Sequence, residues 1–335
     1  MAFYPPALAC CRKKVYHTCK MKTRVLVNRI GGGLGNQMFS YALVENLARK
    51  LNAVQTYDIT DFFVFRYLVP QKESARDFQL SHFKGPRKYR KWGTLKSYLF
   101  LLVWIIGKKA GWRAFEKIVN LLGMHWWHSN GIFETNFPEI PDDGKTVYCC
   151  GMHLDVTKMP DVDVLRNEFA LADPLSIESA HMEHLILECE SVSVHVRRTD
   201  YLNQAQPWAL DFSYYERAIE HVAKSITNPK WFIFSDDTEW CRDRFSFLSA
   251  PDVKIIDFNA TRPWEDIHLM RICKHHIIAN STFSWWAAYL ADERQGMTLC
   301  PDKWGPYVGK TPDVFYRDGW ITIDSGPSFR KSEEC

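Results

Sequence analysis

The chain has 335 residues, which is too long for one minimal domain. Of these residues 46% are apolar and 24% are charged, which is typical of a globular protein with a buried core. Its 42 basic and 39 acidic side chains leave a formal net charge of +3, too small a bias to indicate a nucleic-acid-binding protein. The ten cysteines show no zinc-type or thioredoxin-type spacing, so we expect reduced thiols in a cytoplasmic protein. No apolar run reaches the roughly twenty residues of a membrane-spanning helix.

Residues 1–22 are expected to form a disordered extension. The basic run Arg12-Lys13-Lys14 follows the apolar residues of this segment, which is the reverse of the order in a secretory signal peptide. Met21 precedes the first predicted strand, which leaves open a second interpretation, that translation starts there.

A first domain is predicted over residues 23–185. It opens with an apolar strand at 25–30, a glycine-rich loop, a helix at 36–51 and a second strand at 53–58, the order that begins a parallel α/β domain. Later in this domain the pattern predicts one buried strand and two helices, at 147–150, 164–169 and 177–189.

Residues 60–140 are predicted to be an irregular insertion, rich in basic and aromatic residues. Between Lys84 and Lys117 there are ten Lys or Arg residues and one acidic residue, Glu116. One interpretation is a helical insertion with a solvated basic face. The other is a surface that contacts anionic lipid or an acidic acceptor.

A second domain is predicted over residues 186–335, where strands again alternate with helices. The strands are expected at 191–196, 231–234, 253–256, 277–279 and 298–300, and the helices at 214–225, 265–273 and 284–290. Two successive α/β units predict an α/β fold of two Rossmann-like lobes that face each other across a cleft, with ligands at the carboxyl ends of the strands.

The glycine loop from Gly31 to Gly35 is followed by Asn36 and Gln37 at the expected start of a helix. Glycines let a backbone approach a ligand closely, and a helix N-terminus favours anions. Asn36 stands where the dinucleotide fingerprint needs its last glycine, which disfavours an NAD-dependent enzyme, and the lysine of a P-loop is missing. A purely structural turn is the alternative.

The segment from His195 to Asp200 ends a predicted buried strand. Alternation places His195 and Arg197 on one face of the sheet and Arg198 on the other. Adjacent arginines at a buried strand end are costly unless they meet anions, and a guanidinium fork matches phosphate oxygens. The alternative is a salt bridge to Asp200 or another carboxylate.

Two further polar clusters follow strand ends. Asp236 and Asp237 are suited to accept hydrogen bonds from a base or ribose, to bind a metal, or to cap the next helix. The segment 280–284 combines hydroxyls with helix-start amides, which suits phosphate, and capping by Ser281 or Ser284 is its alternative role.

Together, four segments resemble the α-1,2-fucosyltransferases of glycosyltransferase family eleven, of the bacterial type, in the family's order and spacing between about residues 24 and 325. The segments are Gly32-Gly33-Leu34-Gly35-Asn36-Gln37-Met38-Phe39, His195-Val196-Arg197-Arg198-Thr199-Asp200-Tyr201, Phe234-Ser235-Asp236-Asp237 and Ile278-Ala279-Asn280-Ser281-Thr282-Phe283-Ser284-Trp285-Trp286-Ala287-Ala288-Tyr289-Leu290. The arginine segment resembles core α-1,6- and protein O-fucosyltransferases as well, whereas the last segment is more specific to family eleven.

The resemblance implies a GT-B-like fold whose C-terminal lobe holds GDP-β-L-fucose. It also implies inverting, metal-independent transfer to the 2-hydroxyl of a β-galactoside in surface polysaccharide (O-antigen or capsule) synthesis. Charge that grows on the leaving GDP needs a cation, and we assign this role to Arg197, helped by Ser284. Asp200 is the candidate general base, and orientation of Arg197 is its alternative role. The resemblance places His195 near the donor and Asp236 at the guanosine.

The predicted site therefore has three groups of residues. The catalytic residues are Arg197, Asp200 and His195; the donor-binding residues are Arg197, Arg198, Asp236, Asp237, Asn280, Ser281, Thr282 and Ser284; and the acceptor side of the cleft has Gly33, Gly35, Asn36 and Gln37.

A DxD pattern, used by metal-dependent glycosyltransferases, is present at Asp161 and Asp163. It follows Pro160 and precedes a predicted helix, where aspartates act as caps, instead of following an apolar strand. We therefore expect no metal and no cofactor besides the donor.

The expected partners are GDP-fucose and a galactose-containing glycan, with no nucleic acid. If the basic insertion contacts anionic lipid, the acceptor is lipid-linked and the protein lies peripherally on the cytoplasmic face of the inner membrane. Two alternatives remain for the activity: a fucosyltransferase of other regiochemistry (α-1,6 or O-linked), or a non-catalytic GDP-sugar-binding protein.

Overall fold

The computed structural model describes most of both predicted domains. The predicted extension over residues 1–22 and much of the insertion lie outside the described residues. The described residues are 24–62, 76–88, 91–93, 95, 97–98, 102, 112–128, 139–141, 143–151, 154–203, 208–292, 296–305 and 315–326.

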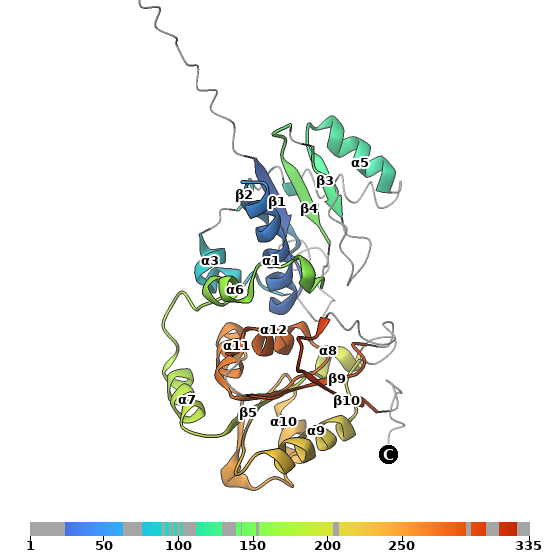
Figure 1. The fold of residues 1–335 in the computed structure, drawn as a ribbon. Coiled ribbons are helices and arrows are strands. Elements are labelled where there is room, and N and C mark those ends of the chain that lie inside the picture. The colour runs from blue at the N-terminus through green and yellow to red at the C-terminus, as the bar shows by residue number, and fades with distance from the viewer. Residues whose placement is uncertain are drawn as a thin grey trace, which may run out of the picture.

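The first of two separate sheets has four parallel strands in the order β2-β1-β4-β3 (Figure 1). The strands are β1 (Val25–Arg29), β2 (Val54–Asp58), β3 (His125–His128) and β4 (Val147–Cys150). Because β3 belongs to this sheet, the prediction of an irregular segment over 60–140 is wrong near its C-terminal end. The four residues of β3 show no alternation of polar and apolar side chains that would mark a strand.

The second sheet has six parallel strands in the order β7-β6-β5-β8-β9-β10. The strands are β5 (Ser191–Val196), β6 (Lys230–Ser235), β7 (Val253–Ile256), β8 (His275–Ile277), β9 (Thr298–Pro301) and β10 (Ile321–Ile323). Counted within this half of the chain, the order is 3-2-1-4-5-6, that of doubly wound nucleotide-binding sheets. The order reverses between β5 and β8, so ligands are expected at the carboxyl ends of these two strands.

Helices cover both faces of the second sheet. On one face, α9 (Phe212–Ser225) and α10 (Thr238–Arg244) pack over Val194 and Val196 of β5. On the other face, α11 (Pro263–Ile272) and α12 (Thr282–Leu290) pack over apolar side chains of β6 and β7. The remaining described helices are α3 (Lys84–Arg87), α5 (Trp112–Leu121), α6 (Val162–Glu168), α7 (Ile177–Leu187) and α8 (Thr199–Leu202).

The expected α/β fold with two parallel sheets is confirmed. The clearest error in an element's position is β8, which begins two residues before the predicted strand at 277–279. His275 and His276 are polar by type but are only 3% exposed each, so residue type alone concealed the start of this buried strand. Within the part of the chain that the structure describes, no helix has both the length and the apolar character needed to cross a membrane.

Helix α1 (Leu34–Lys50) lies between the two sheets (Figure 1) and is buried on nearly all sides. Val44 and Leu47 pack with apolar residues of the first sheet. Met38 and Phe39 belong instead to a cluster that contains helices of the second half. Both halves of the chain therefore cover this helix.

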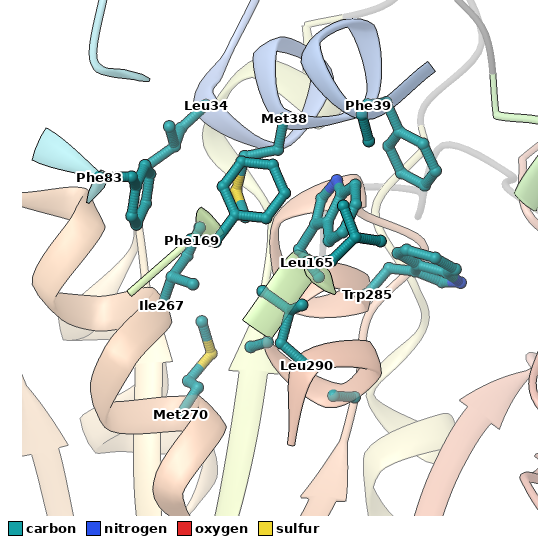
Figure 2. Close-up of a cluster of buried hydrophobic side chains, with 14 of the residues drawn as sticks. Leu34, Met38, Phe39, Phe83, Leu165, Phe169, Ile267, Met270, Trp285 and Leu290 are labelled. Carbon is teal, nitrogen blue, oxygen red and sulfur yellow. The ribbon is translucent and has the colours of Figure 1, made fainter. Parts of the chain in front are cut away.

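One hydrophobic cluster joins the two halves of the chain (Figure 2). The ring centroid of Phe39 lies 4.7 Å from that of Trp285 and 4.8 Å from that of Trp286. Side chains of α6 and α11 lie in the same cluster, and Figure 2 shows Leu165 and Met270 among them. Aromatic side chains bury large apolar areas, so this shared core fixes how the two halves are oriented.

Gly35 determines how closely α1 approaches α12. A Cβ atom at this position would lie 2.5 Å from the carbonyl carbon of Thr282 and 2.7 Å from the amide nitrogen of Phe283, too close for any real side chain. Two hydrogen bonds cross at the same point: the Trp286 indole donates to the Gly35 carbonyl oxygen at 3.0 Å, and the Thr282 hydroxyl donates to Asn36 Oδ1 at 2.8 Å. Glycine is therefore required here by the approach of two backbones.

We expect Gly35→Ala to lower the free energy of unfolding by about 1–3 kcal/mol, because the added methyl group forces α1 away from α12. The matched control is Gly33→Ala: residue 33 has φ −70° and no atom within 4 Å of an added Cβ. Urea denaturation of both variants measures the difference. Equal stability of the two variants would contradict the role assigned to Gly35.

Candidate active site

The predicted donor residues gather at the carboxyl ends of β5, β6 and β8, beside the point where the strand order reverses. Arg197 and Arg198 follow β5, Asp236 and Asp237 follow β6, and Asn280 follows β8. The parallel pairing of β5 with both β6 and β8 brings these three loops to one edge of the sheet.

Arg197 is held between two carboxylates. Its Nη2 donates to Asp200 Oδ2 at 2.8 Å, and its Nη1 lies 3.2 Å from Asp236 Oδ2. Burial opposes the charged form of the guanidinium, but the two aspartates outweigh burial and raise the pKa of Arg197 above its ordinary value. Arg197 is therefore a permanent, well-oriented cation at the sheet edge.

Asp236 organises the turn that carries the arginines. Its Oδ1 accepts from the backbone N–H of Arg198 at 2.9 Å, and its Oδ2 accepts from the Thr199 hydroxyl at 2.5 Å, besides its pairing with Arg197. Both carboxylate oxygens are thus engaged with the loop after β5. The predicted contact of Asp236 with guanosine stays a prediction.

Arg198 points away from Arg197, as the alternation of the strand predicts. Its Nε donates to Asp237 Oδ2 at 3.1 Å, and its guanidinium carbon lies 3.9 Å from the ring centroid of Trp240 on α10. Asp237 also accepts from the backbone N–H of Trp240 as the N-cap of α10. Of the roles predicted for Asp236 and Asp237, helix capping is therefore the one that the Asp237 side chain performs.

His195 and Asn280 each place at the reversal point a buried polar atom that has no partner among the described residues. His195 is 4% exposed and Asn280 is 1% exposed. Among the described residues, neither His195 Nδ1 nor Asn280 Oδ1 has a hydrogen-bond partner, although Asn280 Nδ2 donates to the Trp208 carbonyl at 2.9 Å. Burial, together with the charge of Arg197, lowers the pKa of His195 to about 3, so the imidazole is neutral at physiological pH.

The hydroxyl groups before and within α12 serve the local structure. Ser281 caps α12 by accepting from the backbone N–H of Phe283, which is the capping alternative considered for this segment. The Ser284 hydroxyl accepts from the Ala279 N–H at 3.2 Å and is 1% exposed, so it is engaged inside its own loop. The Thr282 hydroxyl donates to Asn36 Oδ1, which belongs to the first half of the chain.

The residues predicted on the acceptor side of a cleft join the two halves. Gly33 is the N-cap of α1, and Gly35 and Asn36 contact α12. The Gln37 side chain is fully buried: its Nε2 donates to the carbonyl oxygens of Gly32 and Asp77 at 3.0 and 2.8 Å, and its Oε1 accepts from the N–H of Gln79 at 3.0 Å. Gln37 therefore anchors residues 77–79 to the start of α1.

Arg76, which the sequence analysis did not identify, comes next to this anchored segment. Its Nη2 donates to Asp200 Oδ2 at 2.8 Å, the same oxygen that accepts from Arg197. Burial favours the neutral carboxyl group, but the two arginines outweigh it and lower the pKa of Asp200. No motif surrounds Arg76 in the sequence, and only the approach of the two halves brings it to the site.

Both aspartates of the DxD pattern are engaged in the local structure of α6. Asp161 is the N-cap of α6, accepting from the N–H of Asp163 at 2.9 Å, and Asp163 accepts from Arg166 at 2.7 Å. Among the described residues, no group of three His, Cys, Asp or Glu side chains is arranged to hold a metal ion.

The sequence is similar to a known protein family. The sequence model of glycosyl transferase family 11 matches residues 136–324, more than half of the chain. The matched region contains the arginine segment, the paired aspartates and the segment that leads into α12. The chain therefore belongs to glycosyltransferase family 11.

Individual relatives fall into two groups by coverage. The chain is 27% identical over 311 residues to the O-antigen biosynthesis glycosyltransferase WbnK of Escherichia coli, covering 88% of this chain and 99% of that protein. It is 35% identical over 136 residues to an Escherichia coli alpha-1,2-colitosyltransferase, covering 39% of this chain and 46% of that protein. It is 32% identical over 138 residues to galactoside alpha-(1,2)-fucosyltransferase 1 of Ateles belzebuth, covering 38% of each. The chain thus matches less than half the length of the last two proteins.

Solved structures give more distant matches. The fucosyltransferase NodZ from Bradyrhizobium is matched with a TM-score of 0.49 and 16% identity, over 81% of this chain and 93% of that chain. The ADP-heptose lps heptosyltransferase II of E. coli is matched with a TM-score of 0.40 and 12% identity, over 84% of this chain and 86% of that chain.

Proposed function

We propose that this family 11 glycosyltransferase transfers L-fucose from GDP-β-L-fucose to the 2-hydroxyl of a β-galactoside, with inversion to an α-linkage. The observation that carries the proposal is Arg197, a guanidinium oriented by two aspartates at the point where the strand order of a nucleotide-binding sheet reverses. The names of two relatives specify α-1,2 transfer, and the WbnK name specifies O-antigen biosynthesis, which supports a surface polysaccharide as the acceptor.

The chemistry requires one proton acceptor and one centre of positive charge. The acceptor oxygen attacks C1 of fucose, the bond from C1 to the diphosphate oxygen breaks, and GDP leaves with the electron pair. Arg197 meets the growing charge on GDP, so no metal is needed. Asp200 takes the hydroxyl proton. Because two arginines share its Oδ2, donor binding has to draw at least one of them away before Asp200 becomes an effective base.

His195 and Asn280 support donor binding in this proposal. The neutral imidazole of His195 and the amide oxygen of Asn280 are both buried and unpaired among the described residues, and buried polar groups are normally hydrogen-bonded. Polar groups of the donor would satisfy them, and this gain would favour the GDP-sugar over a ligand without matching groups.

The direct test is release of GDP from GDP-fucose in EDTA, with and without lactose or N-acetyllactosamine, followed by linkage analysis. We expect acceptor-dependent release and a 2-linked α-fucosyl galactose. An α-1,6 or O-linked product would replace the proposed regiochemistry. GDP binding without turnover on a broad glycan panel would identify a binding protein, and activity that depends on added manganese would revive the metal interpretation.

The colitosyltransferase relative introduces a second candidate donor sugar. Running the same assay with the corresponding colitose donor would decide between the sugars. If colitose is transferred faster than fucose to the same acceptor, the proposed donor sugar becomes colitose and the proposed α-1,2 linkage is unaffected.

We expect Arg197→Ala to reduce kcat by about a hundredfold or more while the protein stays folded, because a preorganised contact to the leaving group is lost. Arg242→Ala is the matched control, since Arg242 pairs with Asp257 on an exposed part of the second half. Near-normal kcat for Arg197→Ala, with both variants folded by circular dichroism, would remove Arg197 from the mechanism.

The proposal extends to the location of the acceptor, which we place on a lipid carrier at an anionic membrane surface. Leu95, Tyr98 and Leu102 are 84%, 44% and 57% exposed, and they are spaced i, i+3 and i+7 in the sequence, the spacing typical of an amphipathic helix. The surrounding segment from 84 to 117 has ten Lys or Arg residues and one acidic residue. Apolar side chains among basic ones suit insertion at an anionic lipid surface.

We expect the protein to sediment with phosphatidylglycerol-containing vesicles at low salt and to be released at high salt, because screening weakens the attraction of basic residues to the lipid. Replacing Leu95 and Leu102 by Ser should reduce the bound fraction severalfold. The control replaces Ile177 and Leu187, which are 88% and 61% exposed on α7. Absence of binding at low salt would leave the basic segment as a solvated surface.

A further inference from the structure

We propose that Arg76, from the first half of the chain, is a second donor-binding cation that contacts the diphosphate together with Arg197. This inference rests on the proposed function and adds a residue to its donor site. It also means that donor binding involves both halves of the protein.

The geometry places Arg76 at the reaction site. Its Nη2 lies 2.8 Å from Asp200 Oδ2, and Arg197 Nη2 lies 2.8 Å from the same oxygen. Both guanidiniums therefore converge within hydrogen-bond distance of one atom. The Arg76 side chain is 38% exposed and that of Arg197 is 20% exposed, so a ligand has access to both.

The backbone beside Arg76 is held firmly. Residues 77 and 79 are bonded to the fully buried amide of Gln37, and α1, which contains Gln37, is packed against α12. A long arginine side chain at the edge of a mobile loop loses much entropy when it binds a ligand. The Gln37 anchor removes the backbone part of that cost for Arg76.

The charges favour a diphosphate as the group that Arg76 meets. One carboxylate oxygen cannot match two guanidiniums, each of which has five N–H donors. Asp236 is engaged with Arg197 and the loop after β5, and Arg198 is directed toward Asp237 and Trp240. Among the described residues, Arg76 is therefore the cation that we place on a diphosphate beside Arg197, and both guanidiniums have further N–H donors for its oxygens.

The competing explanation is that Arg76 only fastens the two halves together through Asp200. A fastening role would affect binding of any ligand that needs the two halves in register, whatever the charge of the ligand. A donor-binding role would affect GDP and leave guanosine unaffected, because guanosine has no phosphate. The two ligands therefore separate the explanations.

The experiment measures the Kd of GDP and of guanosine for the full-length protein and for Arg76→Gln and Arg76→Lys by titration calorimetry. We expect the Kd of GDP to rise about tenfold in Arg76→Gln and less in Arg76→Lys, with the Kd of guanosine unchanged. Arg87→Gln is the matched control: Arg87 is also an arginine of the first half that pairs with an aspartate, Asp173, on an exposed surface. This control should bind both ligands normally.

A second test repeats the Arg76→Gln substitution in a protein that already carries Asp200→Asn, to detect an effect that acts only through the ion pair with Asp200. In Asp200→Asn, the ion pair to Arg76 is weakened, so a fastening role predicts that Arg76→Gln has no further effect on GDP binding. The donor-binding role predicts that the loss persists. Unchanged GDP affinity in Arg76→Gln, equal losses for GDP and guanosine, or a loss that vanishes in Asp200→Asn would each overturn this inference alone. Failure of the unmodified protein to bind GDP would overturn the proposed function as well.

Discussion

The backbone contact between Gly35 and Thr282 is the constraint on which the rest of the site depends. It lets the N-terminal ends of α1 and α12 touch, and the shared aromatic core then holds the two halves in one orientation. Because each helix follows the carboxyl end of a strand, the contact brings the functional edges of both sheets together. Arg76 reaches Asp200 only as a consequence of this arrangement. A side chain at residue 35 would move the two edges apart.

The candidate site is an array of paired charges. Three arginines and three aspartates of the described residues are paired across loops that follow different strands and, at Arg76, across the two halves. The aspartates keep Arg197 charged and oriented in a partly buried place, where an isolated guanidinium would be costly. In the proposed mechanism, Arg197 stabilises the charge that develops on GDP, and at least one arginine leaves Asp200 when the donor binds.

The roles of individual residues were harder to predict than their positions. Ser281 and Asp237 were considered both as donor ligands and as helix caps, and each side chain caps a helix in the structure. Gln37 is predicted at the acceptor side of a cleft, but its buried amide bonds to the backbone of Gly32 and of residues 77 and 79. A polar residue at a strand end has the same residue type whether it serves a ligand or a backbone N–H, so spacing along the chain cannot separate the two uses.

The sequence by itself determined the α/β class, most strands and helices, and the loops in which the proposed functional groups lie. Those features depend on local periodicity, turn residues and motifs, which are readable along the chain. Only the tertiary structure decided that α1 is shared between the two sheets, that Gly35 serves a backbone contact, and that Arg76 pairs with Asp200. Arg76 and Asp200 are 124 residues apart. Their ion pair depends on how the two lobes pack, and no local sequence pattern predicts a contact between residues so far apart in the chain.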